Sequence, residues 1–452
     1  MGSFSKRTEF DAPVEALWRF HERPGAFERL NPPFDPVELV ERTEGLEVGS
    51  RTTVRLKVGP ASQLWTAEHV GYERGAMFQD AQTKGPFAKW VHTHRMSPVS
   101  PTRSALEDSI EYELPLGGLG ALFGGGFTQR TLERLFRYRH ALTALDLQRH
   151  APHEPKPKLT FAITGATGLI GTALTAFLRG GGHAVRPVKR SADGMRFDPE
   201  AIAGADVVVH LAGASIADGR WTPERKGTLV KSRVEVTRSL VETLRALSPR
   251  PKVLLAGSAI GIYGDRGADV LDERSEVDRS PSKGAGFLSA LCRDWEAEGR
   301  SAEGLGMRVV TLRTGIVLSA NGGALGKMLP PFKAGAGGPL GGGQAYMSWI
   351  ALEDVLGAIL HLATEPKVSG PVNLTAPAPA TNADFTRALG QALGRPAVVP
   401  VPAFALKTLF GEMAEGTILA SQRVLPKALE QSGFRFAFPT LDSALRFTLG
   451  AD

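Results

Sequence analysis

The sequence predicts an α/β protein whose larger part is a doubly wound, mainly parallel β-sheet covered by helices. After residue 158, short and almost continuously apolar strands alternate with helical stretches, which is typical of parallel strands buried on both faces. The first of these strands runs into a glycine-rich turn and an amphipathic helix, as at the start of a Rossmann-type unit. The sheet domain is expected over 159–399, followed by a small helical domain over 400–452.

The sequence pattern of residues 1–150, before the sheet domain, predicts an α+β domain. Alternating or β-branched residues bounded by turn residues predict strands at 50–58, 87–96 and 104–115. Helical spacing of apolar residues predicts helices at 13–30, broken at Pro24, and at 128–148. Four aromatic residues either line an apolar pocket of this domain or fill its core: Trp18, Trp65, Trp90 and Phe136.

A Pro-rich joint, 151–158, separates the two regions. Prolines at this density disfavour both helix and sheet, so we predict a stiff, extended linker. The sheet domain then begins. Its apolar runs predict strands at 159–164, 184–190, 205–213, 252–259 and 308–318.

Composition and charge narrow the classes of function. The net charge is +6, and the basic residues are scattered without a stripe of interleaved aromatics. This balance suits a phosphate-bearing small molecule and predicts no nucleic-acid partner. The single cysteine, Cys292, excludes an intramolecular disulfide and fits a reducing, cytoplasmic location. We expect neither a signal peptide nor a membrane span, because no apolar run is long enough.

Three glycines in the first turn form a G-x-x-G-x-x-G pattern that can cradle a pyrophosphate. Gly165 permits the tight turn, Gly168 lets the backbone approach the phosphates, and Gly171 lets the helix pack closely on the sheet. The pattern lies between a predicted strand and a predicted helix, which is the context it requires. We therefore predict a dinucleotide site that also uses the backbone of Thr167, Leu169 and Ile170. A glycine-rich turn without a ligand is the alternative.

The tip of the second predicted strand indicates which dinucleotide is bound. An NAD site usually carries a carboxylate there, whereas this chain has Lys189, Arg190 and Ser191. Cations at that position favour a 2′-phosphate, so the prediction is NADP. A solvated, basic strand end is the alternative.

Two further segments belong to the predicted cofactor site. Asp198 can hold an adenine amino group or cap a helix. The third strand ends in Leu211, Ala212 and Gly213, small or apolar residues that suit a backbone running beneath a cofactor. His210, just before them, is interpreted as a packed strand residue rather than a base.

The sequence resembles the short-chain dehydrogenase/reductase superfamily in its extended, epimerase-like form. The motifs "GSAIGIYGD", "CRDWEAE" and "GPVNLTAP" are similar to one atypical subgroup, often labelled nucleoside-diphosphate-sugar epimerases, over 159–450. The resemblance includes a small C-terminal domain of unknown function. Residues 1–150 resemble, more weakly, the START-like, polyketide-cyclase-like (SRPBCC) helix-grip family, in which a curved antiparallel sheet grips a long helix around an apolar cavity.

The superfamily's usual proton-transfer pair is missing. That pair is a Tyr-x-x-x-Lys on one helix, in which the Lys lowers the pKa of the Tyr. In sugar epimerases a Glu follows the Lys by four residues. If Glu296 is that Glu, Cys292 stands at the Lys position and Leu288 at the Tyr position. Cys292 can act as a nucleophile, but we interpret it as a small buried hydrophobe.

Ser258 and Tyr263 remain as catalytic candidates. Ser258 resembles the substrate-orienting Ser of the superfamily, and Tyr263 either donates a proton or only packs. Two functions stay open. The leading one is NADP-dependent hydride transfer on a carbonyl, alcohol or sugar-like small-molecule substrate, and Ser258, Tyr263 and the intact glycine turn favour it. The other is a catalytically silent NADP(H)-binding regulator with an apolar ligand in its N-terminal domain, and the missing Tyr-Lys pair favours it.

Metal binding has one weak candidate. His92 and His94 alternate on a predicted strand and so share one face. A metal site needs a third ligand, and the local sequence shows none. We therefore predict no metal and interpret this pair as a solvated face.

Overall fold

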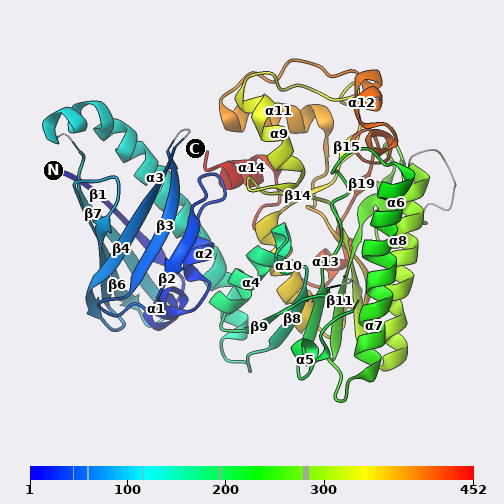
Figure 1. Ribbon diagram of the computed structural model, residues 1–452, viewed down its shortest axis with the longest axis horizontal. Coiled ribbons are helices and arrows are strands. Elements are labelled where there is room, and N and C mark those ends of the chain that lie inside the picture. Colours follow the sequence, from blue (N-terminus) through cyan, green and yellow to red (C-terminus); the bar gives the residue numbers. More distant parts are fainter. Residues whose placement is uncertain are drawn as a thin grey trace. The chain divides into compact units, whose positions relative to one another are not determined.

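The computed structural model describes residues 1–43, 45–58, 61–115, 117–192, 194, 196–277 and 285–451. Contacts divide the chain into two compact units (Figure 1). Unit 1 comprises Met1–Lys158 with Ala176–Gly182, and unit 2 comprises Leu159–Thr175 with His183–Asp452. The predicted fold class is confirmed, because an antiparallel-sheet unit precedes a parallel, helix-covered sheet.

Unit 1 is an antiparallel sheet with the strand order β1-β7-β6-β5-β4-β3-β2. The strands are β1 (Gly2–Phe10), β2 (Glu38–Arg42), β3 (Arg51–Val58), β4 (Ala61–Glu73), β5 (Met77–Lys84), β6 (Lys89–Ser100) and β7 (Arg103–Glu113). The three predicted strands correspond to β3, β6 and β7. The others were not predicted, because a strand such as β1 buries only two of its nine side chains.

Three helices complete unit 1: α1 (Val14–Glu22), α2 (Ala26–Leu30) and the long α3 (Gly117–His150). Gly25 separates α1 from α2 with a φ of +100°, the left-handed conformation that glycine adopts freely. The inner side of α3 packs on the sheet, where the Phe136 and Phe4 rings lie 5.2 Å apart. Trp18, Trp90 and Phe136 are buried in apolar clusters and so belong to the core, the second of the two alternatives, while Trp65 packs partly buried against the cluster that contains Trp90.

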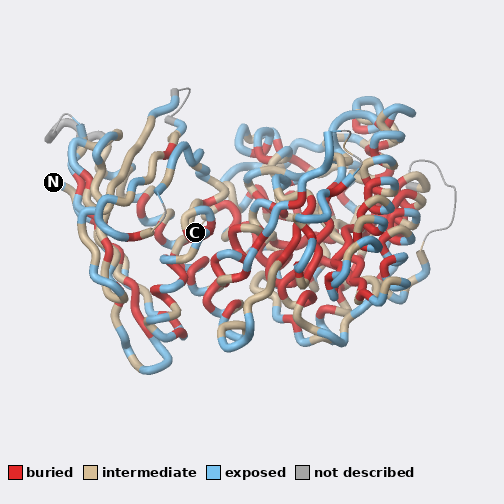
Figure 2. Tube along the Cα trace, turned by 60° about the horizontal axis from the view of Figure 1, so that its bottom comes forward, coloured by how far each residue is buried: buried red, intermediate tan, exposed pale blue. Residues whose placement is uncertain are grey.

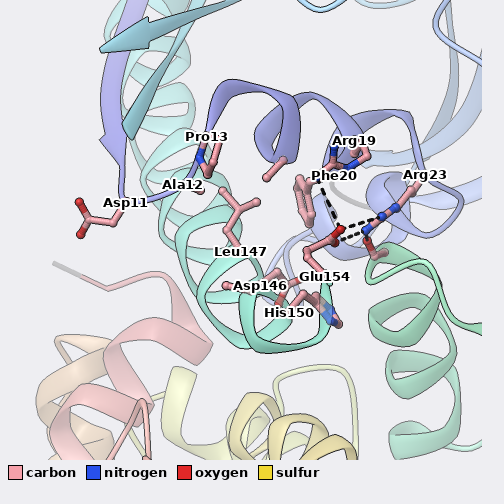
Figure 3. A pocket seen from close by; sticks show the side chains of 13 residues that line it. Asp11, Ala12, Pro13, Arg19, Phe20, Arg23, Asp146, Leu147, His150 and Glu154 are labelled. Atoms are coloured by element: carbon pink, nitrogen blue, oxygen red, sulfur yellow. Dashed lines mark hydrogen bonds and ion pairs between the residues drawn. The ribbon is translucent and has the colours of Figure 1, made fainter. Parts of the chain in front are cut away.

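The predicted linker begins differently from the expectation. Ala151–His153 form a 3₁₀ turn, η1, directly after α3. The carboxylate of Glu154 then pairs with Arg23 at 2.8 Å and with Arg19 at 3.5 Å (Figure 3). These ion pairs hold the start of the joint against α1, so it is not a freely extended segment.

Unit 2 contains a parallel sheet with the strand order β17-β13-β11-β10-β8-β9. The strands are β8 (Thr160–Thr164), β9 (Ala184–Val188), β10 (Val207–His210), β11 (Val253–Ala259), β13 (Arg308–Thr314) and β17 (Gly370–Leu374). The order along the sheet reverses between β8 and β10, which makes their carboxyl ends a topological switch point where such folds bind ligands. The predicted strands of the sheet domain are therefore confirmed.

Helices cover this sheet and continue beyond its carboxyl edge (Figure 1). The helices that accompany it are α4 (Leu169–Gly180), α5 (Pro199–Ile202), α6 (Pro223–Val230), α7 (Val236–Ala246), α8 (Ala285–Arg300) and α10 (Leu352–Thr364). Gly315 joins β13 to β14 (Ile316–Leu318), which pairs with β16 (Trp349–Ala351). The remaining helices are α9 (Gly323–Lys333), α11 (Asn382–Leu393), α12 (Ala403–Phe410), α13 (Lys427–Gln431) and α14 (Leu441–Leu449).

Buried residues are concentrated in the interior of unit 2 (Figure 2). The central strands are almost fully inaccessible, and Phe161, Ala162 and Ile163 of β8 are all 0 % exposed. Each buried Phe or Ile side chain contributes about 1.5–3 kcal/mol to folding. Within the described part of the chain, none of the helices has the length and apolar character needed to cross a membrane.

Candidate functional site

The glycine turn after β8 lies against the end of β10. Gly165 has a φ of +71°, and a Cβ placed on it would lie 2.8 Å from the backbone carbon of Leu211. A Cβ on Gly171 would lie 2.2 Å from the Gly165 oxygen. Neither position tolerates a side chain, so both glycines are required for the turn itself.

Gly168 differs from the other two glycines. A Cβ there would meet only the Gly165 oxygen, at 3.3 Å. Thr167 and Gly168 are exposed, and α4 begins immediately after them. The first N–H groups of a helix have no acceptor within the helix, so this turn presents free donors and the positive end of a helix dipole. An anionic group fits in front of it.

The basic strand tip is close to this turn, because β9 pairs with β8. Lys189, Arg190 and Ser191 are all exposed. Arg190 forms a bridge with Phe197, and its Nη1 donates to the Gly194 oxygen at 3.3 Å. Its guanidinium therefore keeps most of its donors for another partner.

Two neighbouring polar residues have internal partners. Asp198 accepts a hydrogen bond from the Glu200 N–H at 2.9 Å and caps α5, the second of the two roles considered for it. His210 is fully buried between the hydroxyls of Thr164, at 2.7 Å, and Thr237, at 2.9 Å. Burial lowers the pKa of His210 to about 4, so the ring is neutral and packs as predicted.

A buried polar network occupies the carboxyl ends of β11, β13 and β17. The Ser258 hydroxyl donates to Glu296 Oε1 at 2.7 Å. Arg313 donates to both Glu296 oxygens, at 2.8 and 2.9 Å, and also to the Tyr263 hydroxyl at 2.9 Å. The Tyr263 hydroxyl in turn donates to Asn373 Oδ1 at 2.9 Å. This network connects α8 with three strands of the sheet, and every member is at most 5 % exposed.

The electrostatics of the network keep its charges fixed. Burial alone would lower the pKa of Arg313, but its hydrogen bonds to Glu296 outweigh that effect and raise it. Burial raises the pKa of Tyr263. Its hydroxyl already donates a hydrogen bond to Asn373, so the donor is used inside the protein.

The predicted positions of the Tyr-Lys pair are filled by apolar atoms. Leu288 packs so closely on Gly261 that a Cβ there would lie 2.5 Å from it. Cys292 is 1 % exposed, and burial raises the pKa of its thiol to about 12, which fits a buried hydrophobe rather than a nucleophile. One face of α8 thus carries Leu288, Cys292 and Glu296 toward the sheet.

A buried cation that the sequence did not single out lies beside the loop after β10. Arg233 is 7 % exposed and donates to the Ala214 oxygen at 2.9 Å. Its guanidinium carbon lies 3.3 Å from where a Cβ of Gly213 would be. The Nε of Arg233 has no hydrogen-bond partner among the described residues. Only the tertiary structure reveals it, because Arg233 lies on a helical segment 20 residues after Gly213.

The interpretation of His92 and His94 as a solvated face is wrong. His92 is 5 % exposed, because α3 covers this side of the sheet. Asp80 on β5 and Asp108 on β7 face the two histidines from the flanking strands. The missing third group is thus on a neighbouring strand, where local sequence does not show it.

Comparisons with known proteins assign three regions in order. Residues 10–136 match the family "Polyketide cyclase / dehydrase and lipid transport", and residues 161–374 match the "NAD dependent epimerase/dehydratase family". Residues 401–448 match "Domain of unknown function (DUF1731)". The three resemblances predicted from the sequence are confirmed.

Individual relatives cover most of unit 2. Epimerase family protein Mb2239 of Mycobacterium bovis is 43 % identical over 297 residues, which are 63 % of this chain and 96 % of that protein. A crystal structure of a nucleoside-diphosphate sugar epimerase from Corynebacterium glutamicum is 32 % identical with a TM-score of 0.80, over 99 % of this chain and 90 % of that one. The structure of human epimerase family protein SDR39U1 (isoform 2) with NADPH is 33 % identical with a TM-score of 0.60, over 64 % and 99 %.

Proposed function

Because the chain belongs to this epimerase family, we propose that unit 2 binds NADP(H) across the carboxyl edge of its parallel sheet. The observation that carries the proposal is the glycine turn at the switch point. Gly165 and Gly171 allow the turn to form, and Gly168 leaves its outer side open in front of α4. This arrangement suits a pyrophosphate. The human relative, whose structure contains NADPH, supports the same class of ligand.

The choice of NADP over NAD rests on the tip of β9. Lys189 and Arg190 are exposed at the strand end beside the glycine turn. A guanidinium binds a phosphate through two parallel hydrogen bonds, whereas the ribose hydroxyl of NAD needs an acceptor. We assign the 2′-phosphate contact to Arg190, with Lys189 adding charge.

Arg233 supplies a second cation for the dinucleotide. It lies beside Gly213, two residues after the Leu211 backbone that Gly165 touches. It has an unused buried Nε and no ion pair among the described residues. A buried cation without an anion is costly, so an anionic group of the cofactor is the partner that the site lacks.

For the role of the bound cofactor, the geometry favours NADP(H) binding without built-in proton transfer. Tyr263 is 0 % exposed and its proton is held by Asn373, while Leu288 and Cys292 replace the usual acid. These facts fit a regulator or sensor that binds NADP(H) without reacting with it. Hydride transfer on a carbonyl, alcohol or sugar-like substrate is the second candidate. Ser258 favours it, because it stands at the end of the strand beside which a nicotinamide would lie, although its hydroxyl also donates to the buried Glu296 carboxylate.

The test is a comparison of cofactors by titration calorimetry. Arg190→Ala should weaken NADPH binding about ten-fold or more, because a charge-assisted contact contributes about 1.5–3 kcal/mol. NADH binding should hardly change. Arg186→Ala, on the same strand and also exposed, is the matched control and should leave both affinities unchanged. If Arg190→Ala weakens NADPH and NADH binding equally, Arg190 does not contact the 2′-phosphate. A second variant, Gly168→Val, tests the glycine turn: if it binds NADPH as tightly as the wild type, the dinucleotide binds elsewhere.

A broad screen for NADPH-dependent turnover separates the two roles. Turnover of any carbonyl substrate by the wild type would favour the oxidoreductase. No turnover in the screen, together with intact and specific NADPH binding, would favour the regulator.

A further inference from the structure

Polar side chains from four elements meet inside unit 1, between the sheet and α3. Asp80 is directly opposite His92 in the ladder of β5 with β6, and His94 is directly opposite Asp108 in the ladder of β6 with β7. His140 reaches them from α3. Asp80, His92, His94 and Asp108 therefore share the covered face of the sheet, and His140 faces them from α3. Buried carboxylates and imidazoles in such number require an explanation.

Three of these residues bring one possible metal-ligand atom each close together. One donor atom from each of Asp80, His92 and His94 lies within 4.8 Å of the others. Asp80 Oδ2 is 3.5 Å from His92 Nδ1 and 3.7 Å from His94 Nε2. These separations are long for direct hydrogen bonds. Ligands that share one ion at about 2.0–2.2 Å in a tetrahedral site lie about 3.4 Å apart, so the spacing fits a common ion.

The far sides of both imidazoles face a single carboxylate. Asp108 Oδ1 lies 2.9 Å from His92 Nε2, in a hydrogen bond. It also lies 2.6 Å from His94 Nδ1, although not along a hydrogen-bond direction. A carboxylate behind a metal-binding histidine holds the proton on the far nitrogen and leaves the near nitrogen as an acceptor. Asp108 does this for His92 through its hydrogen bond to Nε2, which leaves Nδ1, the nitrogen that faces Asp80, as the acceptor.

Asp108 is itself held in place. Its Oδ2 lies 2.6 Å from His140 Nε2, and His140 Nδ1 lies 2.7 Å from the Thr8 hydroxyl of β1. Asp108 and His140 are 2 and 3 % exposed. A buried support of this kind fixes the orientation of ligands, which is what a site needs in order to bind an ion tightly.

The charges also call for a cation. Asp80 and Asp108 place two carboxylates in a mostly buried space, and Arg139 of α3 balances only part of their charge. A bound divalent ion would balance the rest. Two imidazole nitrogens and one carboxylate oxygen suit zinc and similar transition ions, whereas Mg²⁺ and Ca²⁺ prefer oxygen ligands. Nothing else assigned to this protein uses the cluster.

We propose that unit 1 contains a Zn²⁺-type site with Asp80, His92 and His94 as ligands and Asp108 and His140 as positioning residues. Three protein ligands leave a coordination position open. The Asp80 and His94 side chains are 17 and 12 % exposed, against 3 % for Asp108, so the opening lies on the Asp80 side. The Phe78 ring, stacked on His94 with centroids 4.0 Å apart, forms an apolar wall there. Water or an oxygen atom of a bound small molecule completes the site.

The experiment uses the untagged full-length chain, freed of metal by dialysis against a chelator. It is titrated with Zn²⁺ in a calorimeter and with Co²⁺ by visible absorption. We expect one ion per chain. Asp80→Asn and His94→Gln should weaken binding by roughly 100-fold or more, and Asp108→Asn by about 10–100-fold, as for other supporting carboxylates. Thr93→Val is the matched control, because Thr93 lies between the two histidines but donates no group to the cluster and binds Gln79 instead.

Two results would overturn the proposal. One is a wild-type chain that binds no stoichiometric ion. The other is wild-type affinity in both Asp80→Asn and His94→Gln, which would move the ion elsewhere. Circular dichroism of each variant, together with NADPH titration, checks that both units are folded. If a variant fails to fold, the wild-type Co²⁺ spectrum still decides, because imidazole and carboxylate ligands in a low-coordinate site give stronger visible bands than hydrated Co²⁺.

Discussion

The network around Arg313 in unit 2 and the Asp–His cluster in unit 1 are buried polar clusters of different kinds. In unit 2, the single carboxylate of Glu296 meets the single guanidinium of Arg313 through two hydrogen bonds, and the charges cancel. In unit 1, two carboxylates, Asp80 and Asp108, meet histidines, whose charge is variable. A guanidinium keeps its charge at every ordinary pH, whereas an imidazole exchanges a proton for a metal ion readily. The first cluster is thus complete in itself, and the second has room for a ligand.

The largest effect on stability should come from removing the Arg313 cation from the network in unit 2. Arg313→Met leaves Glu296 buried without its cation, which should lower the free energy of unfolding of unit 2 by about 3–5 kcal/mol. Urea denaturation, followed by a probe in unit 2, measures the loss. Arg308→Met on the same strand is the control and should cost clearly less, since among the described residues Arg308 donates its hydrogen bonds to backbone oxygens. Equal losses would show that the ion pair is not what holds the strand ends together.

A pH titration sharpens the comparison, because unit 2 also keeps a buried histidine, His210, neutral. The pKa of His210 is lowered from 6.5 to about 4, first by burial and second by Arg190. The unfolded chain therefore takes up a proton before the folded chain does. The stability that His210 contributes is present above pH 6.5 and is lost as the pH falls toward 4, by about 3 kcal/mol. The His210→Asn chain should lack this part of the pH dependence in denaturation curves measured from pH 7 to 4.

The smallest effect concerns Tyr263. Tyr263→Phe removes the hydroxyl between Arg313 and Asn373 and should cost about 1–3 kcal/mol of stability. NADPH affinity should change less than two-fold, because the hydroxyl is turned into the protein. A loss of about 10²–10⁴ in NADPH-dependent turnover, without a matching loss of stability, would instead make Tyr263 a general acid and break the comparison.

The parts predicted from sequence are those encoded locally. The glycine turn is a contiguous motif, and its strand and helix follow directly, so the amino-acid order alone places Gly165, Gly168 and Gly171 between them. The catalytic and cofactor roles of individual residues stay predictions, although Asp198 already uses its carboxylate as a helix cap.

The networks could not be predicted, because they depend on strand order and register. Arg313 meets Tyr263, 50 residues earlier, only because β13 lies next to β11. Asp80 was missed for a similar reason. Its strand, "MFQDAQTK", is mostly polar, so nothing in the sequence placed Asp80 opposite His92.

Because its single cysteine, Cys292, is buried, the native chain should not react with thiol reagents. Cys292 is 1 % exposed, and its high pKa keeps it protonated, so an alkylating reagent reaches it only when the apolar cluster around α8 opens. Since unit 1 contains no cysteine, the rate of labelling reports the opening of unit 2 alone. Because Cys292 is not labelled in the folded chain, a surface cysteine introduced into unit 1 can carry a dye or spin label as the labelled site. Cys292 can thus report on unit 2, and an introduced cysteine can report on unit 1.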